Sequence, residues 1–129
     1  MAEVIEITDP THFDETLAQL RGQQDFVVVY ITGGEDASGK NWCGDCTRAK
    51  PNITNYVLNQ TEGKVLKAVV VDKTTWGPSH PYKKHSVVKA RSVPTLLLFN
   101  ADGEVLMRAE NDEDFDNIEL LTAIAKHEW

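Results

Sequence analysis

The sequence is poor in cysteine, in net positive charge and in long apolar stretches. Only two of its 129 residues are cysteine, too few for a disulfide-stapled secreted domain. The formal net charge of −7 argues against nucleic acid or an anionic membrane as partner, because both are bound by clustered lysine and arginine. The longest apolar runs, Phe26 to Ile31 and Leu96 to Phe99, are too short to cross a bilayer.

The first six residues lack the basic start and the apolar core of a secretory signal peptide. We therefore expect a cytoplasmic, reducing location, where structural disulfides are rare. In such a compartment, two cysteines three positions apart indicate either redox chemistry or half of a metal site. Structural zinc sites take four ligands at regular spacing, and the sequence has no second cysteine pair. The pattern therefore favours redox chemistry and no metal.

Strands and helices are predicted to alternate along residues 1–129, which we expect to form a single domain. Pro51 should kink the second helix, and the acidic stretch 110–116 should be a polar lead-in to the last. The order β-α-β-α-β-α-β-β-α predicts an α/β protein with a mixed central sheet flanked by helices on both faces. The expected strands are 3–8, 26–31, 65–71, 95–99 and 104–109, and the expected helices are 10–21, 43–58, 82–87 and 115–125.

The two cysteines lie where thiol chemistry is favoured. Cys43 follows a polar loop and opens a predicted helix, whose dipole and free N–H groups stabilise a thiolate. Cys46 follows one helical turn later, on the same face. We expect Cys43 to be the exposed nucleophile and Cys46 the shielded, resolving thiol. Far downstream, Val93-Pro94 precedes a predicted strand, and an X-Pro bond is the one that readily adopts the cis form.

These features together point to a family. They comprise Tyr30-Ile31-Thr32-Gly33, the loop 35–40, Trp42-Cys43, Asp45-Cys46, Pro51 and Val93-Pro94-Thr95-Leu96. The chain resembles thioredoxins, and most closely the small cytosolic thioredoxin-related proteins of the human fourteen-kilodalton type, whose motif is Trp-Cys-Pro-Asp-Cys. The resemblance implies a thioredoxin fold and a thiol–disulfide oxidoreductase. It also implies that Cys43 is the nucleophile, that Cys46 resolves, and that Pro94 is a cis-proline facing them.

The resemblance implies an activity as well. Such a protein would reduce small disulfides such as cystine, some protein disulfides and nitrosothiols. It needs no bound cofactor, because the Cys43–Cys46 pair itself cycles, with electrons from NADPH through a thioredoxin reductase or an equivalent donor. The backbone of Val93 would pair with the substrate. The alternative is a regulatory binding module whose dithiol state gates a partner contact without sustained turnover.

Residues around the motif carry further expectations. Trp42 should form part of the substrate platform, and Trp76 should be a hydrophobic anchor in its loop. The loops 32–41 and 73–81 should lie at the carboxyl ends of parallel strands and narrow access to Cys43.

Two positions depart from the family pattern. Gly44 stands where the family has proline, and it adds an N–H that can stabilise a thiolate while loosening the backbone. Tyr30 stands where ordinary thioredoxins carry a buried aspartate, and Asp45 is the nearest carboxylate in sequence to replace it.

Overall fold

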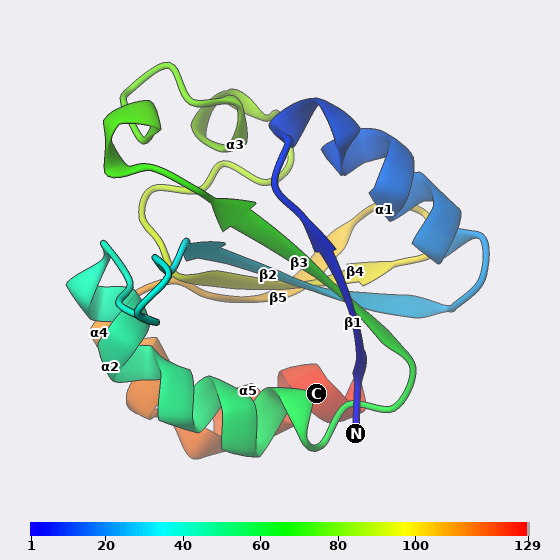
Figure 1. Cartoon of the computed structure of the whole chain (residues 1–129). Coiled ribbons are helices and arrows are strands. Elements are labelled where there is room, and N and C mark those ends of the chain that lie inside the picture. The colour runs from blue at the N-terminus through cyan, green and yellow to red at the C-terminus, as the bar shows by residue number, and fades with distance from the viewer. Residues whose placement is uncertain (129) are drawn as a thin grey trace.

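The computed structural model describes residues 1–128 and is built around a five-stranded mixed sheet in the order β1-β3-β2-β4-β5 (Figure 1). Strands β1, β3 and β2 run parallel, whereas β4 and β5 pair antiparallel. This confirms the predicted mixed sheet. The strands are β1 (Glu3–Ile7), β2 (Phe26–Gly33), β3 (Lys64–Val70), β4 (Thr95–Asn100) and β5 (Val105–Ala109).

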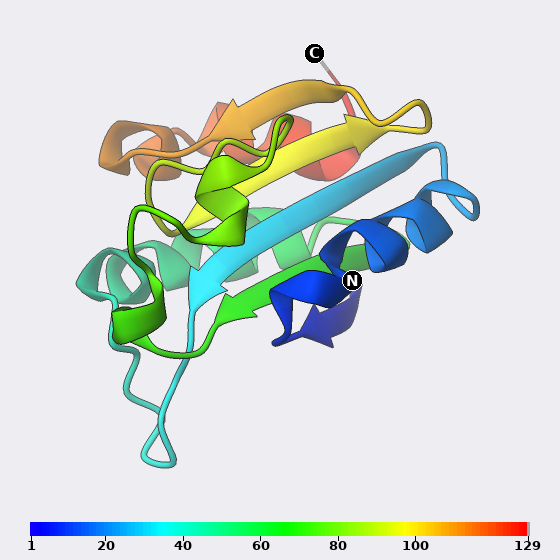
Figure 2. The same ribbon diagram turned by 90° about the horizontal axis from the view of Figure 1, so that it is seen from above.

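Helices cover both faces of the sheet, as the element order predicted (Figures 1 and 2). One face carries α1 (Phe13–Arg21), which follows a 3-10 turn at Pro10–His12, and α3 (Pro81–Lys84). The other carries α2 (Gly44–Ile53), α4 (Asp112–Asp116) and α5 (Ile118–Lys126). Within residues 1–128, no helix is long and apolar enough to cross a membrane.

The central strand β2 explains why its sequence is a continuous apolar run. Val27, Val29 and Ile31 pack into the core beneath α1, whereas Val28 and Tyr30 pack into the core beneath α2 and α5. A strand that is buried on both faces needs apolar side chains at successive positions. The strand ends at Gly33, so the chain that follows emerges at the carboxyl edge of the sheet.

The C-terminal part of the chain corrects one prediction. Residues 112–116 are not a lead-in to the last helix but form a separate helix, α4. Asn111 caps α4 by accepting a hydrogen bond from the Asp114 N–H at 2.9 Å, and Asn117 caps α5 in the same way through the Leu120 N–H at 3.1 Å. Each asparagine satisfies a free N–H group at a helix start, and acidic residues in the first turn of α4 complement the helix dipole.

The second predicted helix, 43–58, is close to the observed helical span but has two parts. Helix α2 continues through Pro51 and passes into a wider π-helical turn at Thr54–Leu58. Helix α3 begins at Pro81 and ends at Lys84, short of the expected 87. It ends early because the His85 side chain accepts hydrogen bonds from the N–H groups of Val87 and Val88, both at 3.1 Å, which competes with helical pairing.

Candidate active site

The dithiol lies at the carboxyl edge of the sheet, where α2 begins. Cys43 and Cys46 are joined in a disulfide, with their Cα atoms 5.3 Å apart. Cys43 is the N-cap residue of α2, and the Cys46 N–H donates a hydrogen bond to its Sγ atom at 3.1 Å. A negative charge that forms on the Cys43 sulfur is therefore stabilised by a helix N-terminus and by a backbone donor.

The two cysteines differ in exposure in the predicted order, but Cys43 is far less exposed than expected. Cys43 is 7% exposed and Cys46 is 1% exposed, so both are buried. The reason is a contact that comes from a distant part of the chain. The carbonyl oxygen of Val93 lies 3.5 Å from Cys43 Sγ, and Val93 and Trp42 pack in the same apolar cluster as the dithiol.

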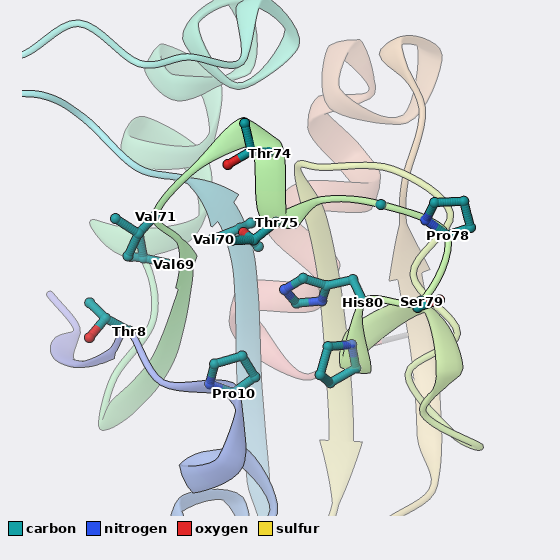
Figure 3. A pocket seen from close by; sticks show the side chains of 12 residues that line it. Thr8, Pro10, Val69, Val70, Val71, Thr74, Thr75, Pro78, Ser79 and His80 are labelled. Atoms are coloured by element: carbon teal, nitrogen blue, oxygen red, sulfur yellow. The ribbon is translucent and has the colours of Figure 1, made fainter.

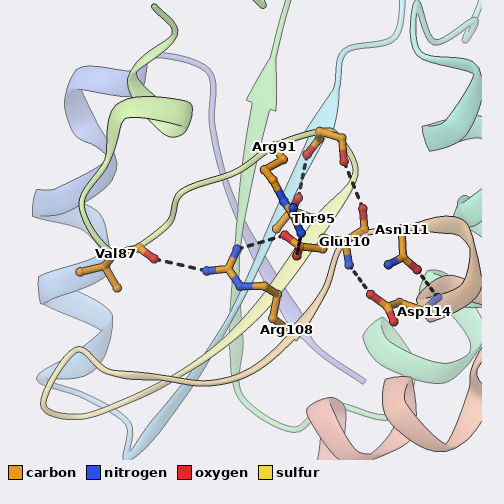
Figure 4. A network of polar contacts seen from close by, with 8 residues as sticks. Val87, Arg91, Thr95, Arg108, Glu110, Asn111 and Asp114 are labelled. Atoms are coloured by element: carbon orange, nitrogen blue, oxygen red, sulfur yellow. Dashed lines mark hydrogen bonds and ion pairs between the residues drawn. The ribbon is translucent and has the colours of Figure 1, made fainter. Parts of the chain in front are cut away.

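The Val93-Pro94 bond is cis, as predicted, and it faces the dithiol through the Val93 carbonyl. Side chains on both sides of this bond hold it in place (Figure 4). The Ser92 hydroxyl donates to the Glu110 carbonyl at 3.1 Å, and the Thr95 hydroxyl donates to the Ser92 carbonyl at 2.7 Å. The cis-proline segment is thereby tied to the end of β5.

Glu110 is the centre of that anchoring network (Figure 4). Its carboxylate pairs with Arg91 at 2.8 Å and with Arg108 at 3.4 Å, and its N–H donates to Asp114 at 3.0 Å. Arg108 also donates to the Val87 carbonyl at 3.3 Å. The segment opposite Cys43 therefore rests on contacts with β5, α4 and the chain after α3.

Asn41 is a site residue that the sequence analysis missed. Its Oδ1 atom accepts from the Cys43 N–H and its Nδ2 atom donates to the Gly33 carbonyl, both at 2.9 Å. It thus fastens the end of β2 to the start of α2. The available signal was an asparagine two residues before Cys43, since asparagine often bonds the backbone two residues on.

Gly33 is required at the end of β2 by close packing. An added Cβ atom would lie 2.7 Å from Asn41 Oδ1, 2.9 Å from Trp42 Cε2 and 3.0 Å from Cys43 Cβ. Its N–H also lies 3.4 Å from Cys46 Sγ. The bare backbone of Gly33 therefore allows the motif to pack against the strand.

Trp42 lies between the two long loops, which meet at one edge of the sheet as predicted. Its indole N–H donates to the Val70 carbonyl at 2.8 Å, which fixes the ring. A cavity of about 450 Å³ opens beside it and is lined from both loops, by Gly34, Glu35, Asp36, Lys40, Asn41, Trp42, Val71, Asp72 and Lys73. The loop after β2 projects beyond the sheet (Figure 2).

Trp76 is a hydrophobic anchor, as predicted. It packs against the same core cluster as α1, its ring centroid lies 4.9 Å from that of His80, and the Lys83 ammonium lies 4.4 Å above it. These contacts hold the second long loop against the sheet.

A second cavity, of about 480 Å³, lies beneath the second long loop and contains neither cysteine (Figure 3). Thr8, Val70, Thr75 and His80 are among its lining residues. Burial lowers the pKa of His80, and its Nδ1 atom accepts from the Tyr82 N–H at 3.1 Å. The imidazole is therefore neutral at neutral pH and caps α3.

Cys46 lines a third cavity, of about 370 Å³, to which neither Cys43 nor Val93 contributes. Tyr30, Glu35 and Lys50 also line it. Burial raises the pKa of Tyr30, and a hydrogen bond with Thr32 offsets this only in part. The Tyr30 phenol is therefore neutral at neutral pH. The resemblance to thioredoxins suggested a buried aspartate at this position, with Asp45 as its replacement.

Asp45 does not replace that aspartate, so this expectation is wrong. Its side chain is 53% exposed, forms an ion pair with Arg48, and lines a cavity with Val93 and Pro94 instead. Successive residues of a helix point about 100° apart, so a carboxylate next to Cys46 in sequence faces another side. The carboxylates that share the cavity of Cys46 are those of Glu6 and Glu35.

Within residues 1–128, no group of three or more histidine, cysteine, aspartate and glutamate side chains could hold a metal ion.

Comparison with solved structures places this dithiol in a known class of proteins. Thioredoxin O2 from Arabidopsis thaliana, in its oxidised state, matches with a TM-score of 0.63 and 18% identity, over 98% of this chain and 94% of that one. Thioredoxin from Plasmodium falciparum matches with a TM-score of 0.57 and 19% identity, over 95% and 99% of the two chains. The fold is the thioredoxin fold.

Sequence comparison narrows the class to a family. The model for the thioredoxin domain of thioredoxin domain-containing protein 17-like proteins matches residues 7–124, so the chain belongs to this family. Human thioredoxin domain-containing protein 17 is 32% identical over 99 residues, which cover 75% of this chain and 77% of that protein. The thioredoxin-like protein Clot from Arabidopsis thaliana is 28% identical over 101 residues, or 73% and 75% of the two chains. The family and the fold together show that the protein is a thiol–disulfide oxidoreductase.

Proposed function

We propose that this oxidoreductase reduces small disulfides such as cystine, together with some protein disulfides and nitrosothiols. In this proposal the Cys43–Cys46 pair is its only redox group, and a thioredoxin reductase or an equivalent donor returns the pair to the dithiol with electrons from NADPH. The observation that carries the proposal is the cavity between the two loops, which opens beside Trp42, the residue before Cys43.

The proposed cycle has two exchange steps. The Cys43 thiolate attacks one sulfur of the substrate disulfide, the substrate S–S bond breaks, and the first substrate thiolate leaves. Cys46 then attacks Cys43 Sγ, the mixed disulfide breaks, and the second thiolate leaves. Two electrons pass from the dithiol to the substrate, and the released thiolates take protons from solvent.

The surroundings of the cysteines support this order of attack. Cys43 is the helix N-cap, is the more exposed of the two, and faces the Val93 carbonyl, along which an extended substrate backbone could pair. Cys46 lies behind it and receives a backbone contact from Gly33. A disulfide that arrives from solvent therefore meets the Cys43 sulfur first.

Charges around the cavity support an amino-acid disulfide as substrate. Lys40 and Lys73 line it together with Asp36 and Asp72, so both signs of charge lie near Trp42. Hydrogen bonds from Ser38 and Lys40 lower the pKa of Asp36, which keeps that carboxylate ionised. The carboxylate and ammonium groups of cystine can each meet an opposite charge here. Because the projecting loop limits the approach of a folded protein, we expect bulky protein disulfides to be poorer substrates.

Turnover tests the proposal. With NADPH and a thioredoxin reductase supplied, cystine should drive steady NADPH oxidation, and the disulfides of insulin should be reduced more slowly. A single stoichiometric oxidation of the dithiol, without turnover, would instead identify a redox-gated binding module.

Loop trimming tests the selectivity separately. Glu35 and Asn41 form an isolated β-bridge, so residues 36–40 can be replaced by an Asn-Gly turn, which suits a two-residue hairpin. The trimmed protein should reduce insulin faster and cystine more slowly, because Asp36 and Lys40 are removed with the loop. If the ratio of the insulin rate to the cystine rate stays unchanged, the loop does not limit the access of protein disulfides to Cys43.

A further inference from the structure

Helix α2 places a lysine next to the resolving thiol. Lys50 follows Cys46 by four residues, so the two side chains lie on one face of the helix, one turn apart. Both line the cavity of about 370 Å³ that Tyr30 also borders. Neither Cys43 nor Val93 lines this cavity.

Lys50 is held in place by an ion pair with the first long loop. Its Nζ atom donates to Glu35 Oε1 at 2.7 Å. This hydrogen bond raises the pKa of Lys50 and lowers the pKa of Glu35, so both groups are charged at neutral pH. The lysine side chain is 60% exposed, and the pairing gives it one preferred direction along the cavity.

The other charged groups near Cys46 lie on other elements or on another face of α2. Lys67 of β3 also lines the cavity, where it lies beside Tyr30 in the sheet and pairs with Glu6 of β1 at 3.5 Å. Asp45 and Arg48 of α2 pair with each other, and Asp45 lines the cavity beside Pro94. Lys50 is thus the cation that shares a helix face with Cys46.

We propose that Lys50, restrained by Glu35, is a positioning residue for the resolving step, and that its ammonium stabilises the Cys46 thiolate. The proposal rests on the role proposed for Cys46 above. In this step the Cys46 thiol loses its proton to solvent through the cavity, and the thiolate then attacks Cys43 Sγ. The bond between Cys43 and the substrate sulfur breaks, and the departing thiolate is protonated by solvent.

A nearby cation helps a buried thiol to form the thiolate at neutral pH. A free cysteine has a pKa of about 8.5, and apolar burial raises it further, so little thiolate exists at neutral pH. Cys46 is 1% exposed, and the neighbouring Tyr30 is neutral. A nearby positive charge shifts the balance towards the nucleophilic form.

Titration of Cys46 alone tests the proposal. In a Cys43→Ser background, Cys46 is the sole thiol, and the ultraviolet absorbance of its thiolate reports its pKa. Lys50→Met should raise that pKa by about half a unit, the scale of an exposed charge pair. Glu35→Gln should lower it, because the ammonium loses its counter-charge. Lys64→Met, at the far end of β3, removes the same charge and should leave it unchanged.

A second measurement keeps both cysteines. When the reduced protein meets an aromatic disulfide such as Ellman's reagent, the first released thiolate reports attack by Cys43 and the second reports resolution by Cys46. At neutral pH, Lys50→Met should slow the second phase about twofold, because half a pKa unit removes about two thirds of the thiolate while the remainder is more nucleophilic, and should leave the first phase unchanged.

Several outcomes would overturn the proposal. They are an unchanged Cys46 pKa in Lys50→Met, a shift of equal size in Lys64→Met, or shifts of the same sign in Lys50→Met and Glu35→Gln. The last result would indicate a purely structural role for the ion pair. Neither measurement uses cystine or a reductase, so a failure to reduce cystine would count against the proposed function and not against this assignment.

Discussion

The two sulfurs of one disulfide meet different surroundings. On the side of Cys43 lie a helix N-terminus, the Val93 carbonyl and the fixed indole of Trp42. On the side of Cys46 lies a cavity that is lined by the neutral phenol of Tyr30 and by the ion pair of Lys50 and Glu35. The Cys43 side is thus built mainly from backbone groups, whereas the Cys46 side is tuned by side-chain charge.

In the proposed cycle, this difference separates the attack by Cys43 from the resolution by Cys46. Backbone dipoles at Cys43 belong to the fold and persist through most surface substitutions, so the attacking thiol depends mainly on the fold. The charges beside Cys46 are surface residues and can be changed without altering the sheet. We therefore expect the resolving step to be adjustable independently of the first attack.

The largest expected effects come from replacing each cysteine in turn, because the two are expected to have different roles. Cys43→Ser should abolish disulfide reduction, because the accessible nucleophile is lost. Cys46→Ser should retain the first attack and accumulate mixed disulfides at Cys43, which mass spectrometry of the adducts would identify. Stable adducts at Cys46 in the Cys43→Ser protein would reverse the assignment of roles.

The next largest effect concerns Gly33, which packs against Cys43 and also contacts Cys46. Gly33→Ala should lower the free energy of unfolding by about 1–3 kcal/mol, because the new methyl group overlaps Asn41, Trp42 and Cys43. Urea unfolding would measure the change. Gly77→Ala is the matched control, since an added Cβ there meets nothing within 4 Å. Equal stability of the two variants would mean that the space around Gly33 can accept a methyl group, so that the motif does not need a glycine there to pack against β2.

Local sequence signals predicted the parts of the site that lie close together in the chain. The apolar run of β2, the dithiol at a helix start and the cis-proline before β4 each follow from a few adjacent residues. The same local signals failed where a contact joins distant segments. The burial of Cys43 depends on Val93, which lies 50 residues away, and no local pattern indicates that contact.

The charges around the dithiol show the same limit. Asp45 was assigned by its nearness in sequence, but the rotation of α2 directs it towards Pro94. Lys50 was detectable in principle, because four residues of helix place it beside Cys46. Its partner Glu35 lies 15 residues away in the loop, and that pairing required the fold.

A smaller effect concerns the Cys43 side alone. Gly44→Pro should stabilise the oxidised protein by about 0.4–1 kcal/mol through the unfolded chain. Gly44 is the first residue of α2, where proline is favoured, Cys43 before it is already extended, and a Cβ at Gly44 meets only Arg48, at 3.6 Å. Thermal unfolding would measure the gain. The pKa of Cys46 should be unchanged, and a shift there would show that the two sides are coupled through the backbone.

The smallest expected effect is that of ionic strength. It distinguishes the backbone groups that act on Cys43 from the side-chain charge that acts on Cys46. The Debye length falls from about 30 Å at 0.01 M to about 3 Å at 1 M ionic strength, so the influence of the half-exposed Lys50 should be screened. The difference in resolution rate between the original protein and Lys50→Met should therefore narrow as salt is added. The first attack should change less, because the hydrogen bond to Cys43 Sγ is short and buried. Stopped-flow release of the aromatic thiolate at several salt concentrations would follow both phases. A difference that persists at high salt would mean that Lys50 acts on Cys46 by direct contact instead of through its field.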